Sequence, residues 1–276
     1  MEKILVVIDP VKANSKLLEF AISIARQTRA AITCLFIEIA GSELVVKDLH
    51  GFPVAFAENE TAKNRLLIKA EIEETLTDFE RKCEERFIPF VVHREYGLPF
   101  DDVVAESRFA DLMLIDAGME PEKKSEQTPT AFVREILRKS ECPVILAPEH
   151  PGDIHEIIFC YDGTPNAMYA IRQFTFLFPQ FKDKKLVILE VAKDEKKDRQ
   201  TEKRLTEWVG NHYTHFHHEI KKGSVRQILF DSIFKKENIF IVMGSFGRNA
   251  LSAFFKKATA ESLIKLTTQP VFIAHA

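Results

Sequence analysis

The chain has 276 residues, of which 46% are hydrophobic and 29% charged, and its formal net charge is −3. This length suits about two ordinary domains with a sizeable core, and the apolar fraction excludes a disordered or fibrous chain. Lys and Arg number 38 against 41 Asp and Glu, so the sequence has no basic excess to hold a phosphate backbone. We therefore expect no nucleic acid as a partner.

The N-terminal apolar run and the cysteines indicate the cellular location of the protein. The apolar run that Asp9 closes is too short for a signal peptide, and no apolar stretch approaches the roughly 18 residues of a membrane helix. No C-x-x-C pattern occurs, and most of the cysteines lie in apolar segments. We expect no membrane partner, a cytoplasmic location and reduced core thiols at Cys34, Cys83, Cys142 and Cys160.

In the first half of the chain, short β-branched runs alternate with longer segments of helical period. The seam of one long helix, from about residue 61, is marked by Ile72, Leu76, Phe79, Cys83 and Phe87. The other predicted helices are 14–29, 99–108 and 130–139, and the predicted strands are 3–8, 31–39, 90–94, 112–116 and 143–147. Buried strands joined by helices predict a parallel α/β sheet with right-handed crossovers.

The same pattern starts again after a Pro- and Gly-containing linker at 148–153. The second set of predicted strands is 157–162, 185–191, 214–220, 239–243 and 270–274. The first strand of each half ends in an aspartate, Asp9 or Asp162. We therefore predict two domains, 1–149 and 152–276.

Landmark spacings support a duplication. Gly97 precedes Pro143 by 46 residues, and Gly223 precedes Pro270 by 47. The interval from the strand-ending aspartate to this glycine is 88 residues in the first half and 61 in the second. The first half therefore carries an insertion, which we place mainly at 41–59 with a longer second helix. This insertion could be a lid, a docking loop or a disordered segment.

The clearest constellation for chemistry is Met243-Gly244-Ser245-Phe246-Gly247-Arg248, which follows the fourth strand of the second half. A glycine at the carboxyl end of a strand lets the backbone approach a ligand, and exposed N–H groups there can hold phosphate. Neighbouring first and fourth strands would put Asp162 and Gly244 on either side of the ligand crevice of an open α/β sheet. Two glycines in a strand-to-helix turn are nevertheless more often structural than functional.

These residues give the sequence a recognisable outline. The second half, with Tyr161-Asp162-Gly163-Thr164, Gly244-Ser245-Phe246-Gly247-Arg248 and Gln269-Pro270-Val271-Phe272-Ile273, resembles a universal stress protein domain. The first half fits the same outline through Val7-Ile8-Asp9, Gly97-Leu98-Pro99 and Cys142-Pro143-Val144. The resemblance implies two doubly wound, adenine nucleotide alpha hydrolase-like domains, each with its own five-stranded parallel sheet of order 3-2-1-4-5. It also implies that the two pack as an intramolecular pseudo-dimer through their last strands.

Some members of that family bind ATP through the pattern G-x2-G-x9-G-[ST], which this sequence matches only in part. Gly244 and Gly247 fit the first two glycines, but Lys257 and Ala258 stand at the third glycine and at the hydroxyl. Lys257 is either a phosphate contact or, more in keeping with exposed lysines in general, a solvated side chain. The candidate ligand or nucleotide residues are Asp162, Val191, Met243, Gly244, Ser245, Gly247, Arg248, Ser252 and Lys257.

The first half departs further from the pattern. Ala117 aligns with Gly244, no second loop glycine follows, and Asp116 with Glu120 and Glu122 would repel a triphosphate. We expect no ATP in this half, and we expect Asp9 to serve as a turn or cap residue.

Two other clusters each allow a functional and a purely structural interpretation. His215 and His217, within a group that includes His212 and His218, could begin a zinc site, but without a third ligand an exposed edge strand is favoured and no metal is expected. Phe174, Leu177 and Phe178 could line a lipid or subunit surface, but their helical spacing favours a core-facing helix.

Known nucleotide and nucleophile signatures are lacking in the sequence, with no G-x-x-x-x-G-K-[ST], G-x-G-x-x-G or G-x-S-x-G. We therefore expect a non-catalytic stress-response protein that binds a small molecule or a protein partner, with no cofactor. The alternative is an ATP-binding protein, at most a slow ATPase, that uses the second half only. Whether two chains form a homodimer, and which ligand or stress is involved, the sequence leaves open.

Overall fold

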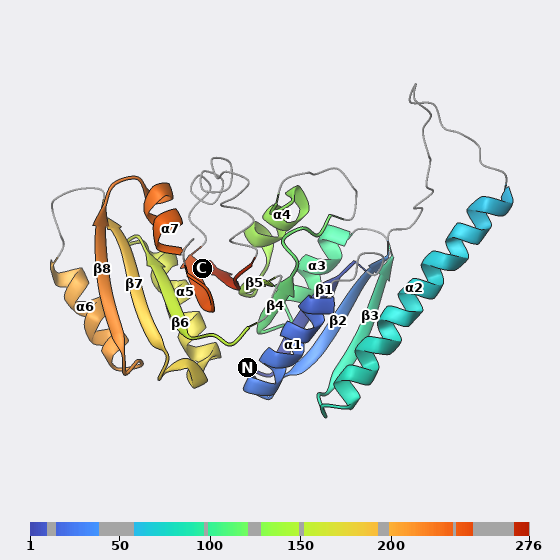
Figure 1. Ribbon diagram of the computed structural model, residues 1–276, viewed down its shortest axis with the longest axis horizontal. Coiled ribbons are helices and arrows are strands. Elements are labelled where there is room, and N and C mark those ends of the chain that lie inside the picture. Colours follow the sequence, from blue (N-terminus) through green and yellow to red (C-terminus); the bar gives the residue numbers. More distant parts are fainter. Residues whose placement is uncertain are drawn as a thin grey trace, which may run out of the picture.

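The structure is a computed structural model. It describes residues 1–9, 15–38, 58–96, 99–120, 128–148, 152–192, 199–233, 236–244 and 268–275 (Figure 1). Most of the predicted insertion at 41–59 lies outside the described residues. Within the part of the chain that is described, no helix combines the length and the apolar character needed to cross a membrane.

The first half follows the predicted order of strands and helices. Its strands are β1 (Lys3–Ile8), β2 (Ala31–Glu38), β3 (Phe90–Tyr96), β4 (Leu112–Ile115) and β5 (Val144–Leu146). Its helices are α1 (Ser15–Thr28), α2 (Glu58–Glu84), α3 (Pro99–Ser107) and α4 (Ala131–Lys139). Helix α4 begins where Thr130 Oγ1 accepts a hydrogen bond from the Val133 amide, at 3.2 Å, which is a standard N-cap.

The second half repeats this order. Its strands are β6 (Glu156–Tyr161), β7 (Lys185–Ala192), β8 (Phe216–Lys222), β9 (Ile239–Gly244) and β10 (Val271–Ala274). Its helices are α5 (Pro165–Leu177), a short 3-10 turn (Pro179–Phe181), α6 (Arg199–Gly210) and α7 (Val225–Ile233).

The strands in the described ranges all belong to one ten-stranded sheet of order β3-β2-β1-β4-β5-β10-β9-β6-β7-β8. Within each half the strands are parallel and follow the predicted order 3-2-1-4-5. The two last strands, β5 and β10, pair antiparallel with Ile145 opposite Phe272. The predicted five-stranded parallel sheet of each half is therefore confirmed, and the two are joined into one sheet through their last strands, where the resemblance implied a contact. The sheets merge because both last strands are short and apolar, and pairing them satisfies the backbone groups that each would otherwise leave open at its edge.

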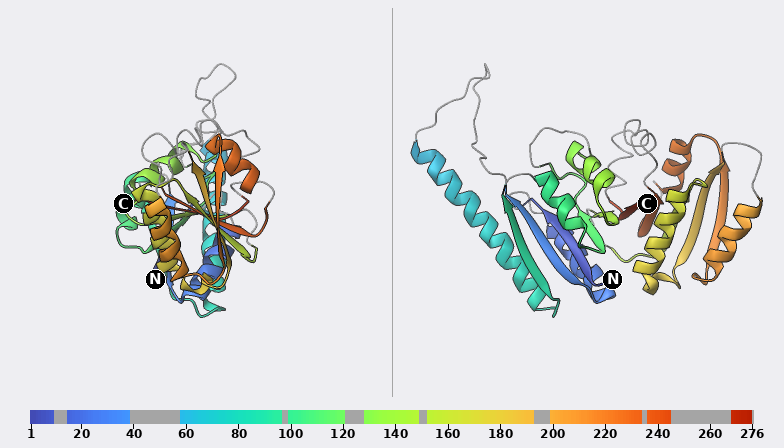
Figure 2. Two further views of the ribbon diagram at one scale, coloured as in Figure 1. Left: turned by 90° about the vertical axis from the view of Figure 1, so that its left-hand side faces the viewer. Right: turned by 180° about the vertical axis from the view of Figure 1, so that it is seen from behind.

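Helices cover both faces of this sheet, as the end-on view shows (Figure 2). Helices α1, α2, α5 and α6 pack on one face, and α3, α4 and α7 pack on the other. Each hydrophobic core cluster contains residues of both halves, so the two halves share a continuous core on each face. Phe174 of α5 lies within it, fully buried, and contacts Phe240 of β9 and Phe272 of β10.

The aromatic helix and the cysteines lie largely as predicted. Phe174 and Phe178 are buried and Leu177 is partly buried, which confirms the core-facing helix. All four cysteines are buried and unbridged, and burial raises the pKa of Cys142 and Cys160 to about 12.

The seam of the long helix needs a correction. Leu76, Phe79 and Cys83 are buried as expected, but Phe87 is 94% exposed. The helix ends at Glu84, and Phe87 lies in the following turn with a φ of 54°, so its side chain no longer follows the helical period.

Candidate ligand site at the carboxyl edge of the second half

Strands β6 and β9 are neighbours, so their carboxyl ends meet as the predicted crevice requires. Cys160 of β6 lies opposite Met243 of β9, and Gly244 ends β9 while Asp162 directly follows β6. The structure thus brings Asp162 and Gly244 to the same edge of the sheet. This is the edge at which open α/β sheets bind ligands.

Gly244 has a packing reason to be glycine. A Cβ added there would stand 2.6 Å from the Asn166 carbonyl carbon and 2.7 Å from the Ala167 nitrogen. Both atoms are backbone atoms in the first turn of α5, which cannot move away as a flexible side chain could. The end of β9 and the start of α5 therefore touch backbone to backbone, and this contact accounts for the glycine without a ligand.

Asp162 is engaged in the turn that starts α5. Its Oδ1 accepts hydrogen bonds from the Thr164 amide at 3.0 Å and from the Thr164 hydroxyl at 2.6 Å. Thr164 Oγ1 in turn accepts from the Ala167 amide at 3.2 Å and caps the helix. The role of turn or cap residue that the sequence suggested for Asp9 is thus seen at Asp162. Asp162 itself remains exposed at the edge of the sheet.

The remaining candidates separate into those that the structure describes and those that it does not. Met243 is 2% exposed, so its side chain belongs to the core and does not line a crevice. Val191, near the end of β7, is partly buried and packs against the same core cluster. The positions outside the described residues are Ser245, Gly247, Arg248, Ser252 and Lys257.

The structure adds a polar pair that the sequence analysis missed. Glu190 of β7 lies opposite Tyr161, the last residue of β6, and its Oε2 lies 2.8 Å from His218 Nε2 on β8. This places a carboxylate and an imidazole near the carboxyl edge, next to Val191. The signal in the sequence was the glutamate within the otherwise apolar run of β7. Burying a carboxylate in a strand costs free energy unless it has a hydrogen-bond or ion-pair partner, so Glu190 indicated that such a partner exists.

The other histidines are dispersed. His212 stacks on Trp208 with ring centroids 4.1 Å apart, His215 precedes β8 in an exposed bend, and His217 is exposed on β8. Strand β8 is the outermost strand of the sheet, which confirms the predicted edge strand. Across the described ranges, no group of three or more His, Cys, Asp or Glu could hold a metal ion.

The corresponding edge of the first half is acidic. Asp116 follows β4, and its Oδ1 accepts a hydrogen bond from the Gly118 amide at 2.6 Å. Glu120 is 8% exposed, and its buried Oε2 has no hydrogen-bond partner. Ala117 is buried at the position that aligns with Gly244.

Comparison with known proteins gives a result for structure but not for sequence. No family model and no curated protein matches the sequence. Among solved structures, a universal stress protein from Archaeoglobus fulgidus DSM 4304 superposes with a TM-score of 0.70 and 18% identity, covering 99% of this chain and 96% of that one. The fold is that of a universal stress protein.

Two further structures share this universal stress protein fold. A functionally unknown protein from Pseudomonas aeruginosa PAO1 superposes with a TM-score of 0.62 and 16% identity over 100% of this chain and 93% of its own. A protein from Pseudomonas aeruginosa UCBPP-PA14 that is assigned as a universal stress protein gives 0.61 and 17% identity over 99% of this chain and 93% of its own. All three matches span both halves, as a tandem arrangement requires.

Proposed function

We propose that this protein is a tandem universal stress protein that acts by binding, without chemical turnover of its own. Its ligand or partner would engage the carboxyl edge of the second half, around Asp162, Val191 and the Glu190–His218 pair. We also propose that it binds ATP weakly or not at all. The fold supports the family assignment, and the chemistry of this edge supports the rest.

The observation that carries the proposal is the backbone contact between Gly244 and the first turn of α5. Gly244 is a residue that a nucleotide loop would need, and packing within the chain already accounts for it. The sequence points the same way, since Lys257 and Ala258 replace the third glycine and the hydroxyl of the ATP pattern. A lost hydrogen bond to a charged phosphate is worth roughly 1.5–3 kcal/mol, so these changes weaken a phosphate site substantially.

ATP binding in the second half is the competing function. It is favoured by the position of Gly244 at the carboxyl end of β9, where β6 and β9 meet beside the N-terminal turn of α5. Besides Asp162 and Gly244, it would use Gly247, Arg248 and Ser252. In the first half, Asp116 and the buried Glu120 argue against a triphosphate by charge.

The deciding experiment is a thermal shift of the full chain with ATP and Mg²⁺, with release of phosphate from ATP measured on the same preparation. We expect no shift at millimolar ATP and no release of phosphate above the protein-free background. A rise of several degrees that Arg248→Ala abolishes would overturn the proposal in favour of nucleotide binding. Arg204→Ala, which changes an exposed arginine of α6, is the matched control and should leave any response intact.

Gly244→Val is unsuitable as a test of nucleotide binding, because the added atoms would displace the start of α5. Asp162→Asn is the better second variant. It keeps the oxygen that accepts the two hydrogen bonds from Thr164 and removes only the charge. An ATP response that survives both Arg248→Ala and Asp162→Asn would place the nucleotide away from this edge.

A further inference from the structure

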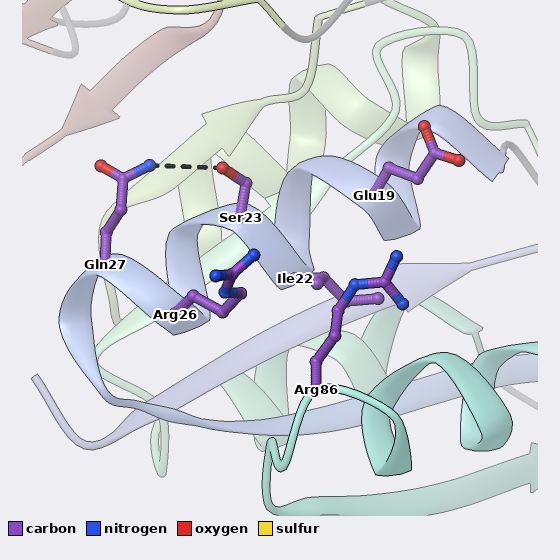
Figure 3. Close-up of a pocket in the computed structure, with 6 residues that line it drawn as sticks. All are labelled: Glu19, Ile22, Ser23, Arg26, Gln27 and Arg86. Atoms are coloured by element: carbon purple, nitrogen blue, oxygen red, sulfur yellow. Dashed lines mark hydrogen bonds between the residues drawn. The ribbon is translucent and has the colours of Figure 1, made fainter.

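A surface depression lies where the second half of α1 faces the turn after α2. Its volume is about 560 Å³, and it is lined by Glu19, Ile22, Ser23, Arg26, Gln27 and Arg86 (Figure 3). Ile22 is buried and forms an apolar floor, while the other lining side chains are polar and exposed. The volume lies in the range of small-molecule sites, and the predominance of polar side chains in the lining suits a charged ligand rather than an apolar one.

Two guanidinium groups flank the floor of the depression. Figure 3 shows those of Arg26 and Arg86 on either side of Ile22, the first from α1 and the second from the turn after α2. Ser23 accepts a hydrogen bond from the Gln27 side chain at 3.2 Å, which leaves the Ser23 hydroxyl proton available to a ligand. Arginine, serine and glutamine side chains together offer donors to an oxyanion.

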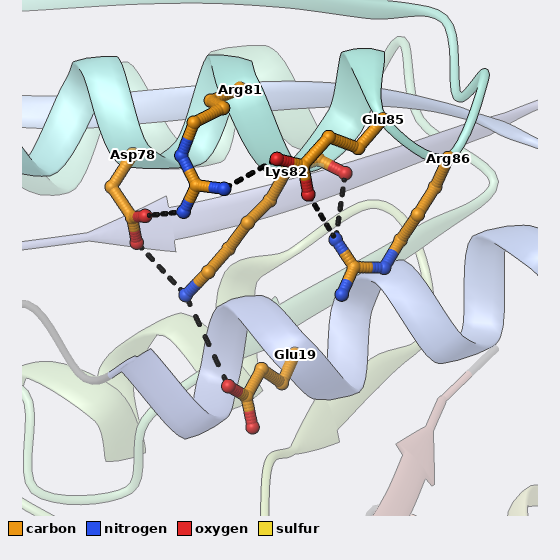
Figure 4. A network of polar contacts seen from close by, with 6 residues as sticks. All are labelled: Glu19, Asp78, Arg81, Lys82, Glu85 and Arg86. Atoms are coloured by element: carbon orange, nitrogen blue, oxygen red, sulfur yellow. Dashed lines mark hydrogen bonds and ion pairs between the residues drawn. The ribbon is translucent and has the colours of Figure 1, made fainter.

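Among the described charged residues around the depression, one arginine has no acidic partner. In the neighbouring network, Asp78 pairs with Arg81 and Lys82, Glu85 pairs with Arg81 and Arg86, and Glu19 lies 4.0 Å from Lys82 (Figure 4). The three acids are thus matched by three bases. Arg26 has neither an ion pair nor a hydrogen bond from its side chain among the described residues. Arg86 lies 3.7 Å from the Glu85 carboxylate and donates one hydrogen bond to the Lys82 carbonyl oxygen at 3.0 Å, which leaves its other N–H groups for a ligand. The side facing the depression therefore carries positive charge that the chain does not neutralise.

The equivalent position in the second half is occupied by different residue types. Arg86 and His212 occupy equivalent positions, because each amide donates to the carbonyl three residues earlier, that of Cys83 at 3.1 Å or of Val209 at 2.9 Å. There, Phe176 of α5 and Trp208 of α6 meet His212 in mutual ring contacts. Aromatic rings thus fill, in the second half, the corner that arginines line in the first. Packing of the fold alone does not require arginines at this corner.

We propose that this depression binds a small oxyanion, a phosphate or carboxylate group, between Arg26 and Arg86, with Ser23 as a further donor and Ile22 beneath the non-ionic part of the ligand. Paired guanidinium groups bind planar or tetrahedral oxyanions through several charge-assisted hydrogen bonds. The site lies at the carboxyl-terminal end of α1, hence near the amino ends of the parallel strands, at the opposite end of the sheet from Asp162. It is therefore separate from the candidate site of the second half.

The test is calorimetric titration of the full chain with inorganic phosphate and, separately, with succinate, at constant ionic strength set with chloride. We expect saturable binding of at least one probe to the unaltered protein. In Arg26→Gln the dissociation constant should be at least about tenfold larger, because one charge-assisted interaction with the anion is lost. Arg172→Gln is the matched control, because Arg172 is an exposed arginine on α5, the counterpart of α1 in the second half. It should bind as the unaltered protein does.

The two probes distinguish the class of anion, because phosphate binding alone indicates a phosphate ligand and succinate binding alone a carboxylate. Arg26 also complements the dipole of α1, and this purely structural role predicts a lower melting temperature in Arg26→Gln with unchanged anion binding. That result would overturn the proposal. The proposal would also be overturned if neither probe bound saturably up to about 50 mM. A site with a millimolar dissociation constant would be nearly full at that concentration and would stabilise the folded state measurably.

Discussion

Gly244 at the end of β9 and Ala167 in the first turn of α5 approach so closely that a Cβ on residue 244 would stand 2.7 Å from the Ala167 nitrogen. The carbonyl oxygen of Asn166 would lie equally near. This relationship fixes where a strand of the second half meets a helix that begins at Pro165, 79 residues before Gly244 in the chain. It also determines how substitutions at this edge of the sheet should be interpreted.

Gly244→Ala should destabilise the protein by at least about 1–3 kcal/mol, the usual cost of overpacking, because the obstacle is backbone. Chemical denaturation monitored by circular dichroism measures the free energy of unfolding. The control is Gly210→Ala at the end of α6, where a Cβ would meet only the Phe216 ring at 3.6 Å, an ordinary contact. Equal stabilities of Gly244→Ala and the unaltered protein would show that the close contact is absent in solution.

The N-cap of α5, which Thr164 forms in the turn after Asp162, should contribute about 1 kcal/mol to the free energy of unfolding. Thr164→Ala removes the oxygen that accepts from the Ala167 amide and should lower the free energy of unfolding by that amount. Thr164→Ser keeps the hydroxyl and should be nearly neutral, as should Asp162→Asn, which keeps the acceptor oxygen. If Thr164→Ser lost as much stability as Thr164→Ala, the threonine would act through its methyl group rather than through the cap.

Phe174 and Phe176 lie on the same helix but differ sharply in burial. Phe174→Ala should cost about 3–5 kcal/mol, because a fully buried ring that contacts Phe159, Phe240 and Phe272 is lost. Phe176→Ala removes a ring that is 57% exposed and should cost less than about 1 kcal/mol. Urea titrations of the two variants make the comparison, and similar losses from both would contradict the orientation of α5.

The ionisation of Glu156 should make stability depend on pH. Burial alone would raise the pKa of Glu156, but hydrogen bonds from Lys185 and Lys236 outweigh it and hold the pKa below its usual 4.5. A lowered pKa in the folded state stabilises the protein above the unfolded-state pKa, and that contribution disappears as the pH falls through the folded-state pKa.

The stability difference between the unaltered protein and Glu156→Gln should therefore be largest near neutral pH and shrink below about pH 4.5. Thermal melts from pH 3 to pH 7 measure it, with Glu207→Gln, an exposed position on α6, as the control. A difference that stays constant across this range would mean that the carboxylate and the two lysines are not paired in solution.

Much of this fold could be predicted from the sequence because the signals are local. The run Lys3–Ile8 is a strand with the predicted bounds, since residues 4–8 are all apolar and the charged Lys3 and Asp9 bound them. The matched spacings from Gly97 and Gly223 identified a duplicated unit, and the strand order of each half is as predicted. The family resemblance implied that the last strands of the two halves meet, but the antiparallel register of Ile145 with Phe272 could not be predicted, because nothing within a short apolar strand specifies which residue pairs with which.

The candidate site could be predicted less well. The sequence placed Asp162 and Gly244 at one edge of the sheet, where the structure has them. It could not show that Thr164 engages the aspartate or that α5 requires the glycine, because both contacts depend on the three-dimensional path after the strand. Glu190 and His218 were not recognised as a pair because they are 28 residues apart and belong to different strands.

The antiparallel seam between β5 and β10 has a consequence for self-association. It leaves β3 and β8 as the outermost strands of the described sheet, so further copies could extend the sheet only from these two ends. Strand β8 presents charged side chains there, including Glu219, Lys221 and Lys222, and charge on a terminal strand discourages fibre-like stacking. Two wholly apolar strands, β5 and β10, are thus paired at the middle, and the strands at the two margins, β3 and β8, both carry charged residues that oppose aggregation.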